Sequence, residues 1–271
     1  MKQHIQQFLI EDIGTNDLSA SSIFSESDKG NANFLAKESG TISGLYIIPE
    51  TYQLLDPSIE VHLLKQDGDK VVSGETIATV NGSIKHILMG ERVILNLLQR
   101  MSGIATRTNE AVQRLSSSHT RICDTRKTVP GLRLFDKYAV ICGGGVNHRF
   151  GLYDGVMIKD NHIAFCGSIE KAVAKVREKL GPMVKIEVET ESEADVIAAV
   201  NSDCDIIMFD NQTPDTIKNW QRHVPKTIVT EASGNITFEN LASYHDTEVD
   251  FISLGYLTHS VTSLDISLGG L

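Results

Sequence analysis

From Thr120 onward, the chain repeats one unit, a run of apolar residues that ends in polar or charged residues. Stretches with helical spacing separate several runs, with Ser168 as a cap before one and Thr213-Pro214 before another. Apolar strands alternating with amphipathic helices are typical of a parallel sheet covered by helices. Six such units suit an open (β/α) barrel, with strands predicted at 121–127, 155–161, 184–189, 205–211, 227–234 and 250–256.

The chemistry of such a barrel lies at the carboxyl ends of its strands. Polar residues or glycine close each run, namely Arg126, Lys127, Lys159, Glu189, Asp210, Ser233, Gly234 and Gly255. We therefore expect these residues to meet at one end of the barrel.

Cationic residues concentrate between Asp124 and His162, where six Lys and Arg face four Asp in a chain of net charge −10. The pair Arg126-Lys127 precedes Pro130, which favours a loop, and Asn147-His148-Arg149 follows three glycines whose N–H groups can approach an anion. A local cationic cluster in an acidic chain predicts a pocket for a small polyanion and argues against a nucleic-acid surface. Lys159 is either an anion ligand or a Schiff-base nucleophile.

Glu189 and Asp210 end successive runs and should be neighbours. They could bind Mg²⁺ with a pyrophosphate, hold ribose hydroxyls, balance a developing positive charge, or simply cap the next helices. We expect Glu187 to lie outside the barrel or to be satisfied in the core. Ser233-Gly234-Asn235 could seat a phosphate at a helix N-terminus. We treat His119 and His162 as structural.

Bulk composition points to a folded protein of 271 residues, 41% hydrophobic, without an apolar run long enough to cross a bilayer or a secretory segment at its start. The four cysteines lack metal-site or paired spacing, so we expect buried thiols and a cytoplasmic protein.

The first hundred residues have a different pattern, with strand candidates at 32–37, 41–47 and 59–65 and a turn at Asp67-Gly68. Apolar residues then recur at helical spacing from Ile87 to Leu115, which predicts one long or broken helix joining two halves.

With these residues laid out, almost the whole chain resembles the quinolinate phosphoribosyltransferase family, the carboxylating pyrophosphorylases of NAD synthesis. The resemblance rests on a combination of segments. These are EDIGTNDLS at 11–19, GERVILNLLQRMSGIAT at 90–106, DTRKTVPGLR at 124–133, GGGVNHRFGLYDGVMIKDNH at 143–162, EVE at 187–189, FDN at 209–211, EASGNI at 231–236 and ISLGYLTHS at 252–260.

The resemblance implies an α/β protein of two domains. Residues 1–105, joined by 263–271, would form an N-terminal α/β sandwich, and residues 106–262 an open α/β barrel. It also implies a homodimer, or an assembly of dimers, whose sites are shared between subunits, with no nucleic-acid or membrane partner. Transfer of phosphoribose from phosphoribosyl pyrophosphate to quinolinate, with Mg²⁺ and loss of CO₂, would give nicotinate mononucleotide.

The family pattern also implies residue roles. Arg92 would reach the neighbouring subunit's pocket, while Arg126, His148 and Arg149 would hold the two carboxylates of quinolinate. Lys127 and Lys159 would lie between quinolinate and the phosphates, and Glu189 and Asp210 would face ribose and Mg²⁺. The 5′-phosphate would be held by Ser233, Gly234 and Gly255.

Three alternatives remain open from the sequence. One is a related enzyme such as nicotinate phosphoribosyltransferase, or a paralogue with another anionic aromatic substrate. The second is a barrel aldolase that forms a Schiff base on Lys159. The third is a catalytically silent phosphate-binding or scaffold protein.

Overall fold

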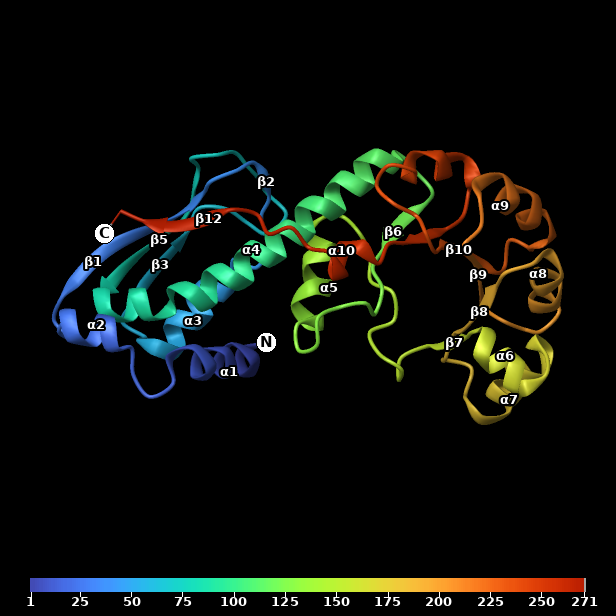
Figure 1. The fold of residues 1–271 in the computed structure, drawn as a ribbon, viewed down its shortest axis with the longest axis horizontal. Coiled ribbons are helices and arrows are strands. Elements are labelled where there is room, and N and C mark those ends of the chain that lie inside the picture. Colours follow the sequence, from blue (N-terminus) through green and yellow to red (C-terminus); the bar gives the residue numbers. More distant parts are fainter. Residues whose placement is uncertain (271) are drawn as a thin grey trace. The chain divides into compact units, whose positions relative to one another are not determined.

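The computed structural model describes residues 1–270, which divide into two compact units (Figure 1). The first contains Met1–Asn109, Val129–Gly144 and the chain from Ser260 onward; the second contains Glu110–Thr128 and Gly145–His259. This division differs from the one expected from the sequence mainly at residues 129–144, which belong to the first unit although barrel strands flank them in the chain.

An antiparallel sheet with strand order β12-β1-β5-β3 forms the centre of the first unit. Its strands are β1 (Lys29–Ala36), β3 (Glu60–Leu63), β5 (Thr76–Ser83) and β12 (Ile266–Gly269), with a separate pair β2 (Gly40–Thr41) and β4 (Lys70–Val71). The expected turn is present, because Gly68 has φ +94 between β3 and β4. The strand expected at 41–47 is wrong beyond Thr41, since a helix begins at Ile47.

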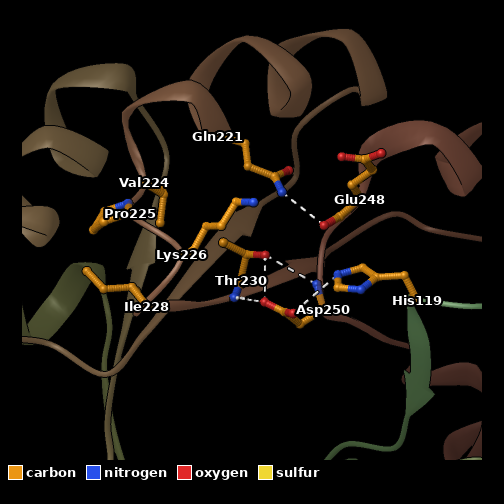
Figure 2. A pocket seen from close by; sticks show the side chains of 9 residues that line it. All are labelled: His119, Gln221, Val224, Pro225, Lys226, Ile228, Thr230, Glu248 and Asp250. Carbon is orange, nitrogen blue, oxygen red and sulfur yellow. Dashed lines mark hydrogen bonds and ion pairs between the residues drawn. The ribbon is translucent and has the colours of Figure 1, made fainter.

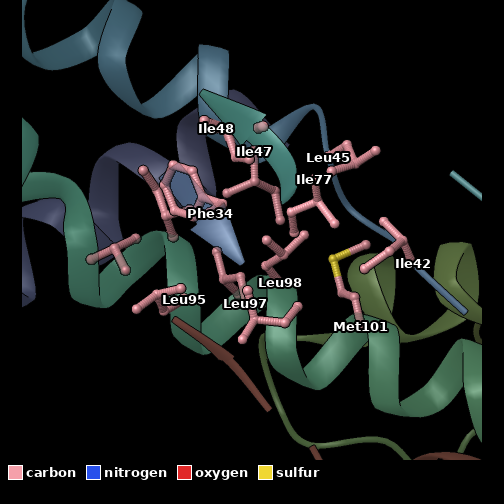
Figure 3. Packing of buried hydrophobic residues seen from close by; sticks show 14 of the residues in the cluster. Phe34, Ile42, Leu45, Ile47, Ile48, Ile77, Leu95, Leu97, Leu98 and Met101 are labelled. Carbon is pink, nitrogen blue, oxygen red and sulfur yellow. The ribbon is translucent and has the colours of Figure 1, made fainter. Parts of the chain in front are cut away.

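The helices of the first unit are α1 (Lys2–Ile13), α2 (Leu18–Ile23), α3 (Ile47–Leu55), α5 (Arg133–Cys142) and most of α4 (Ile84–Leu115). Figure 3 shows Leu95, Leu98 and Met101 of α4 packing with Phe34 and Ile77 of the sheet in one buried cluster. Helix α4 is continuous over 32 residues. Gly103 within it is required by close packing, because a Cβ there would lie 2.1 Å from the carbonyl oxygen of Thr262.

The second unit is built on a six-stranded parallel sheet with order β6-β11-β10-β9-β8-β7. Each predicted run contains one strand: β6 (Arg121–Cys123), β7 (Val156–Ile158), β8 (Ile186–Thr190), β9 (Ile206–Asp210), β10 (Val229–Ser233) and β11 (Phe251–Ser253). The first strand pairs with the last, whereas β6 and β7 are the two ends of the sheet. This is the strand order of a barrel that is open between β6 and β7, and it confirms the predicted fold class.

Helices between the strands lie on the outer side of this sheet (Figure 1). They are α6 (Asp160–Cys166), α7 (Ile169–Lys179), α8 (Glu193–Val200), α9 (Pro214–Trp220), η1 (Gln221–His223) and η2 (Leu241–Thr247). The short helix α10 (Tyr256–His259) follows β11, the last strand of this sheet. The two predicted caps are confirmed, because Ser168 accepts from Lys171 N and Thr213 accepts from Thr216 N. Within residues 1–270, no helix has the length and apolarity needed to span a membrane.

Candidate active site

A cavity of about 560 Å³ opens at the carboxyl ends of the parallel strands. Every site residue predicted from the sequence lines it except Arg92 and Gly255. Gly255 is close by, since a Cβ on it would lie 3.1 Å from Cδ of Lys127. Arg92 lies on α4 in the first unit, where its side chain is 61% exposed and pairs with Glu91. The cavity therefore joins cations and carboxylates that are distant in the sequence.

The guanidinium groups of Arg126 and Arg149 make one wall strongly cationic. Strand β6 ends at Cys123, so Arg126 and Lys127 lie in the loop that Pro130 predicted. Arg149 donates from Nη1 to the Gly155 carbonyl at 2.9 Å, which fixes its direction. Burial and then the nearby charge of Arg126 lower the pKa of Arg149. An anion placed between the two guanidiniums relieves this repulsion, so the wall favours a carboxylate or phosphate.

A second charged cluster in the cavity contains Lys159 and the carboxylates of Glu189 and Asp210. Lys159 directly follows β7 and is ion-paired with Glu189 at the end of β8. Burial raises the pKa of Glu189 and of Asp210, although Lys159 acts against the rise in both. The charged groups of Lys159, Glu189 and Asp210 are thus partly shielded from water, so they interact more strongly than they would in bulk solvent.

His148 lies between two buried glutamates in the wall of the cavity. Its Nε2 is 3.0 Å from Glu187 and 3.4 Å from Glu231, whose side chains are 3% and 4% exposed. Glu187 thus lies in the core, where its Oε2 pairs with His148 but its buried Oε1 has no hydrogen-bond partner among residues 1–270, so the expected satisfaction is only partial. Glu231 was not predicted, although it lies two residues before Ser233 on β10 and therefore on the same face of the strand. Its burial demands a partner, and His148 supplies one.

The ring of His148 meets two opposing demands. The backbone N–H of Arg149 lies 2.7 Å from Nδ1, a contact that only the neutral ring accepts. Burial lowers the pKa of His148, but its hydrogen bonds to the carboxylates of Glu187 and Glu231 and their negative charges outweigh burial and raise the pKa to about 10. The imidazolium is therefore the form that two buried carboxylates favour.

We expect the stabilisation by His148 to decrease as the pH rises. Because its folded pKa of about 10 exceeds the ordinary value, the effect is complete below about pH 6.5 and is lost towards the folded pKa. The free energy of unfolding of wild type relative to His148→Gln should fall with a slope of at most about 1.4 kcal/mol per pH unit. Denaturant unfolding measures this, with the exposed His119→Gln as control. Parallel curves for wild type and His148→Gln would contradict a charged ring.

Ser233, Gly234 and Asn235 form a loop directly after β10. Ser253 Oγ, at the end of β11, donates to Ser233 Oγ at 2.8 Å. The helix that follows is 3₁₀ and begins only at Leu241, so the expected seat at a helix N-terminus is wrong. The loop itself faces the cavity, and its left-handed Gly234 (φ +81) and Asn235 (φ +53) shape it.

A second cavity, of about 510 Å³, lies at the amino-terminal ends of the strands (Figure 2). His119 is 3.3 Å from Asp250 there and serves as a structural partner, as expected. His162 is structural too, accepting from Lys159 N at 3.0 Å. Lys226 is the single Lys or Arg of its lining. This cavity has the carboxylates of Glu248 and Asp250 but lacks the several Arg and Lys side chains of the first cavity, so the first is the candidate active site.

The second unit has an open α/β-barrel fold, and its candidate site brings cations and carboxylates together at the carboxyl ends of the strands. Models of the quinolinate phosphoribosyl transferase N-terminal and C-terminal domains match residues 17–102 and 104–269. The chain belongs to the quinolinate phosphoribosyltransferase family.

Relatives agree along the whole chain. It is 53% identical to a probable carboxylating nicotinate-nucleotide pyrophosphorylase of Bacillus subtilis, over 99% of this chain and 92% of that protein. A corresponding protein of Synechocystis is 43% identical over 97% and 90%. The crystal structure of NadC from Streptococcus pyogenes superposes with a TM-score of 0.96 at 38% identity, over 99% of this chain and 95% of that one.

Proposed function

We propose that this chain is a carboxylating nicotinate-nucleotide pyrophosphorylase. It transfers phosphoribose from phosphoribosyl pyrophosphate to the nitrogen of quinolinate, and CO₂ is then lost to give nicotinate mononucleotide and pyrophosphate. The observation that carries this proposal is the joining, in one cavity, of the guanidinium wall with the Lys159–Glu189 pair and Asp210. A dicarboxylate and a pyrophosphate both need such cations, and a glycosyl transfer also needs the carboxylates.

Quinolinate would be held by Arg126, His148 and Arg149. Two planar guanidiniums offer forked donors that suit its two adjacent carboxylates. Because Arg149 is fixed by the Gly155 carbonyl, its direction is set before the substrate arrives. This placement would aim the ring nitrogen at C1 of the ribose, so that two anionic substrates meet in one orientation.

The transfer breaks the bond between C1 and pyrophosphate and forms the bond between C1 and nitrogen. Positive charge develops on the ribose, which the carboxylates of Glu189 and Asp210 would stabilise. Lys127 and Lys159 would neutralise the leaving pyrophosphate. Ser233, Gly234 and Gly255 would hold the 5′-phosphate, and Lys127 lies beside Gly255.

The carboxylates of Glu189 and Asp210 suit a magnesium ion, because they offer only oxygen ligands next to where phosphates would bind. Burial raises the pKa of each, which is the situation of carboxylates that lack a sufficient positive partner. These two residues would hold Mg²⁺, and the ion would supply charge neutralisation for the pyrophosphate.

Decarboxylation would need no organic cofactor. Transfer to nitrogen leaves the ring nitrogen cationic, so the electron pair released when the neighbouring carboxylate leaves as CO₂ is stabilised by that ring. A proton then adds to the ring carbon that carried the departing carboxylate. The role of Arg126, His148 and Arg149 in this step would be to hold the ring in place.

We also propose a homodimer with shared sites, in which Arg92 of one subunit completes the pocket of the other. Its long cationic side chain is 61% exposed on α4 and is bound only to its neighbour Glu91 in the contacts that the structure gives. An exposed cation of this kind is available to an anion held elsewhere in the assembly.

Schiff-base chemistry at Lys159 is disfavoured by the ion pair with Glu189, because a nucleophilic lysine must be a free amine. A silent scaffold would have no use for the carboxylate pair. The choice between quinolinate and a monocarboxylate such as nicotinate is addressed directly by turnover.

Purified protein with quinolinate, phosphoribosyl pyrophosphate and Mg²⁺ should release CO₂ and form nicotinate mononucleotide in equal amounts. Trapped ¹⁴CO₂ and chromatography of the nucleotide measure both products. Nicotinate in place of quinolinate should give little product, because the second carboxylate is absent. Preference for nicotinate, or no turnover of either acid, would overturn the proposed function.

A further inference from the structure

Asn211 connects the two parts of the cavity that would bind phosphoribosyl pyrophosphate. It directly follows Asp210 at the end of β9, and its side-chain Nδ2 donates to Asp210 Oδ2 at 2.7 Å. Its Oδ1 accepts from Asn235 Nδ2 at 3.0 Å in the loop after β10. One amide thus contacts both the ribose-facing carboxylate and the phosphate-facing loop.

The backbone reinforces this connection. Asn211 N donates to the Ser233 carbonyl at 2.8 Å, and Asn211 has a left-handed φ of +56. Asn is among the few residues that adopt this conformation readily. Position 234, next to Asn235 in the loop, must be glycine, because a Cβ there would lie 2.2 Å from Asn211 Oδ1. The loop is therefore shaped around the Asn211 amide.

A carboxylate that accepts a hydrogen bond from a fixed donor on one oxygen is held in one orientation. The direction of its other oxygen is then fixed as well. For Asp210 this donor is Asn211. The Asn235 end of the connection is supported in turn, because Asn240 Nδ2 donates to the Asn235 carbonyl at 3.0 Å. Displacement of either end would change the spacing between ribose and phosphate contacts.

We propose that Asn211 is a positioning residue that sets the spacing between Asp210 and the Ser233–Asn235 loop, and thereby aligns phosphoribosyl pyrophosphate for attack. This proposal rests on the proposed function. Asn211 acts through Asp210 and the loop and would not itself take part in bond making. Its loss should therefore impair handling of the phosphoribosyl substrate and leave quinolinate binding intact.

Asn211→Gly tests this, since glycine keeps the left-handed backbone and removes only the amide. We expect kcat/KM for phosphoribosyl pyrophosphate to fall about 10- to 100-fold. The KM for quinolinate should stay within about twofold, and the melting temperature within about 4 °C. Asn211→Asp keeps the acceptor for Asn235 but places a negative charge against Asp210, so it should lose at least as much. Asn235→Gly keeps the left-handed backbone (φ +53) and breaks one link, so its kcat/KM for phosphoribosyl pyrophosphate should lie between those of wild type and Asn211→Gly.

Glu248→Gly is the matched control, because Glu248 has the same left-handed φ of +57 but lines the cavity at the other end (Figure 2). It should behave as wild type. Unchanged kcat/KM in Asn211→Gly, or a KM for quinolinate that rises by as large a factor as kcat/KM for phosphoribosyl pyrophosphate falls, would overturn the positioning role. Wild-type turnover in the same assay separates this failure from failure of the proposed function, in which wild type itself would be inactive with quinolinate.

Discussion

Lys159→Met should reduce kcat about 10²- to 10³-fold, the usual effect of removing one group that stabilises developing charge in a dry site. Lys159 is ion-paired with Glu189 and lowers the pKa of both Glu189 and Asp210 against the effect of burial. Without it, the leaving pyrophosphate loses a cation, Glu189 loses its ion-pair partner, and Asp210 loses one of two nearby lysines, the other being Lys127. Initial rates with both substrates saturating measure the change in kcat.

Lys226→Met is the matched control, because Lys226 lines the cavity at the amino-terminal ends of the strands. The same substitution there should leave kcat unchanged. A loss of less than about tenfold in Lys159→Met, with an unchanged melting temperature, would show that Lys159 stabilises little of the developing charge. Borohydride trapping of substrate on wild-type Lys159 would instead favour the aldolase alternative.

The parallel sheet was predictable because most residues of its strands are buried or half-buried, so the strands appear as largely apolar runs. The site followed from the same pattern, since polar residues such as Lys159, Glu189 and Asp210 close those runs. The packing of residues 129–144 was not predictable in this way. Helix α5 lies between two barrel strands in sequence, and only tertiary contacts assign it to the first unit.

The position of Glu187 inside the barrel was predictable from the sequence. Alternation along a strand has a period of two, so Glu187 and Glu189 lie on one face, and both line cavities of the barrel. Glu231 gave the same signal, because it lies two residues before Ser233 on β10 and therefore on the same face. A carboxylate inside an apolar run needs a buried partner, but the partner, His148, comes from a loop far away in the chain, and no local pattern identifies it.

Arg92→Ala should reduce turnover at least about 100-fold if its guanidinium completes a carboxylate site in another subunit. The loss should appear mainly in kcat/KM for quinolinate, because a clamp on a substrate carboxylate acts already in the bound state. Arg92 is exposed on α4 and pairs only with Glu91 in the contacts that the structure gives, so the substitution should leave the melting temperature unchanged. Arg107→Ala, on the same helix, is a charge-matched comparison.

Mixing Arg92→Ala with Glu189→Ala separates a shared site from an unshared one. In a mixed dimer, one pocket receives Glu189 from one subunit and Arg92 from the other and is intact, whereas its twin lacks both. The purified mixed dimer should therefore have about half of wild-type activity, and an unsorted mixture, in which about half of the dimers are mixed, about a quarter. Subunits must be exchanged by co-expression with two different tags, and the doubly tagged dimer assayed after purification. If the mixed dimers are inactive, Arg92 does not act in the partner's pocket. A site built within one subunit would lack Arg92 in one pocket and Glu189 in the other, so neither pocket would be complete.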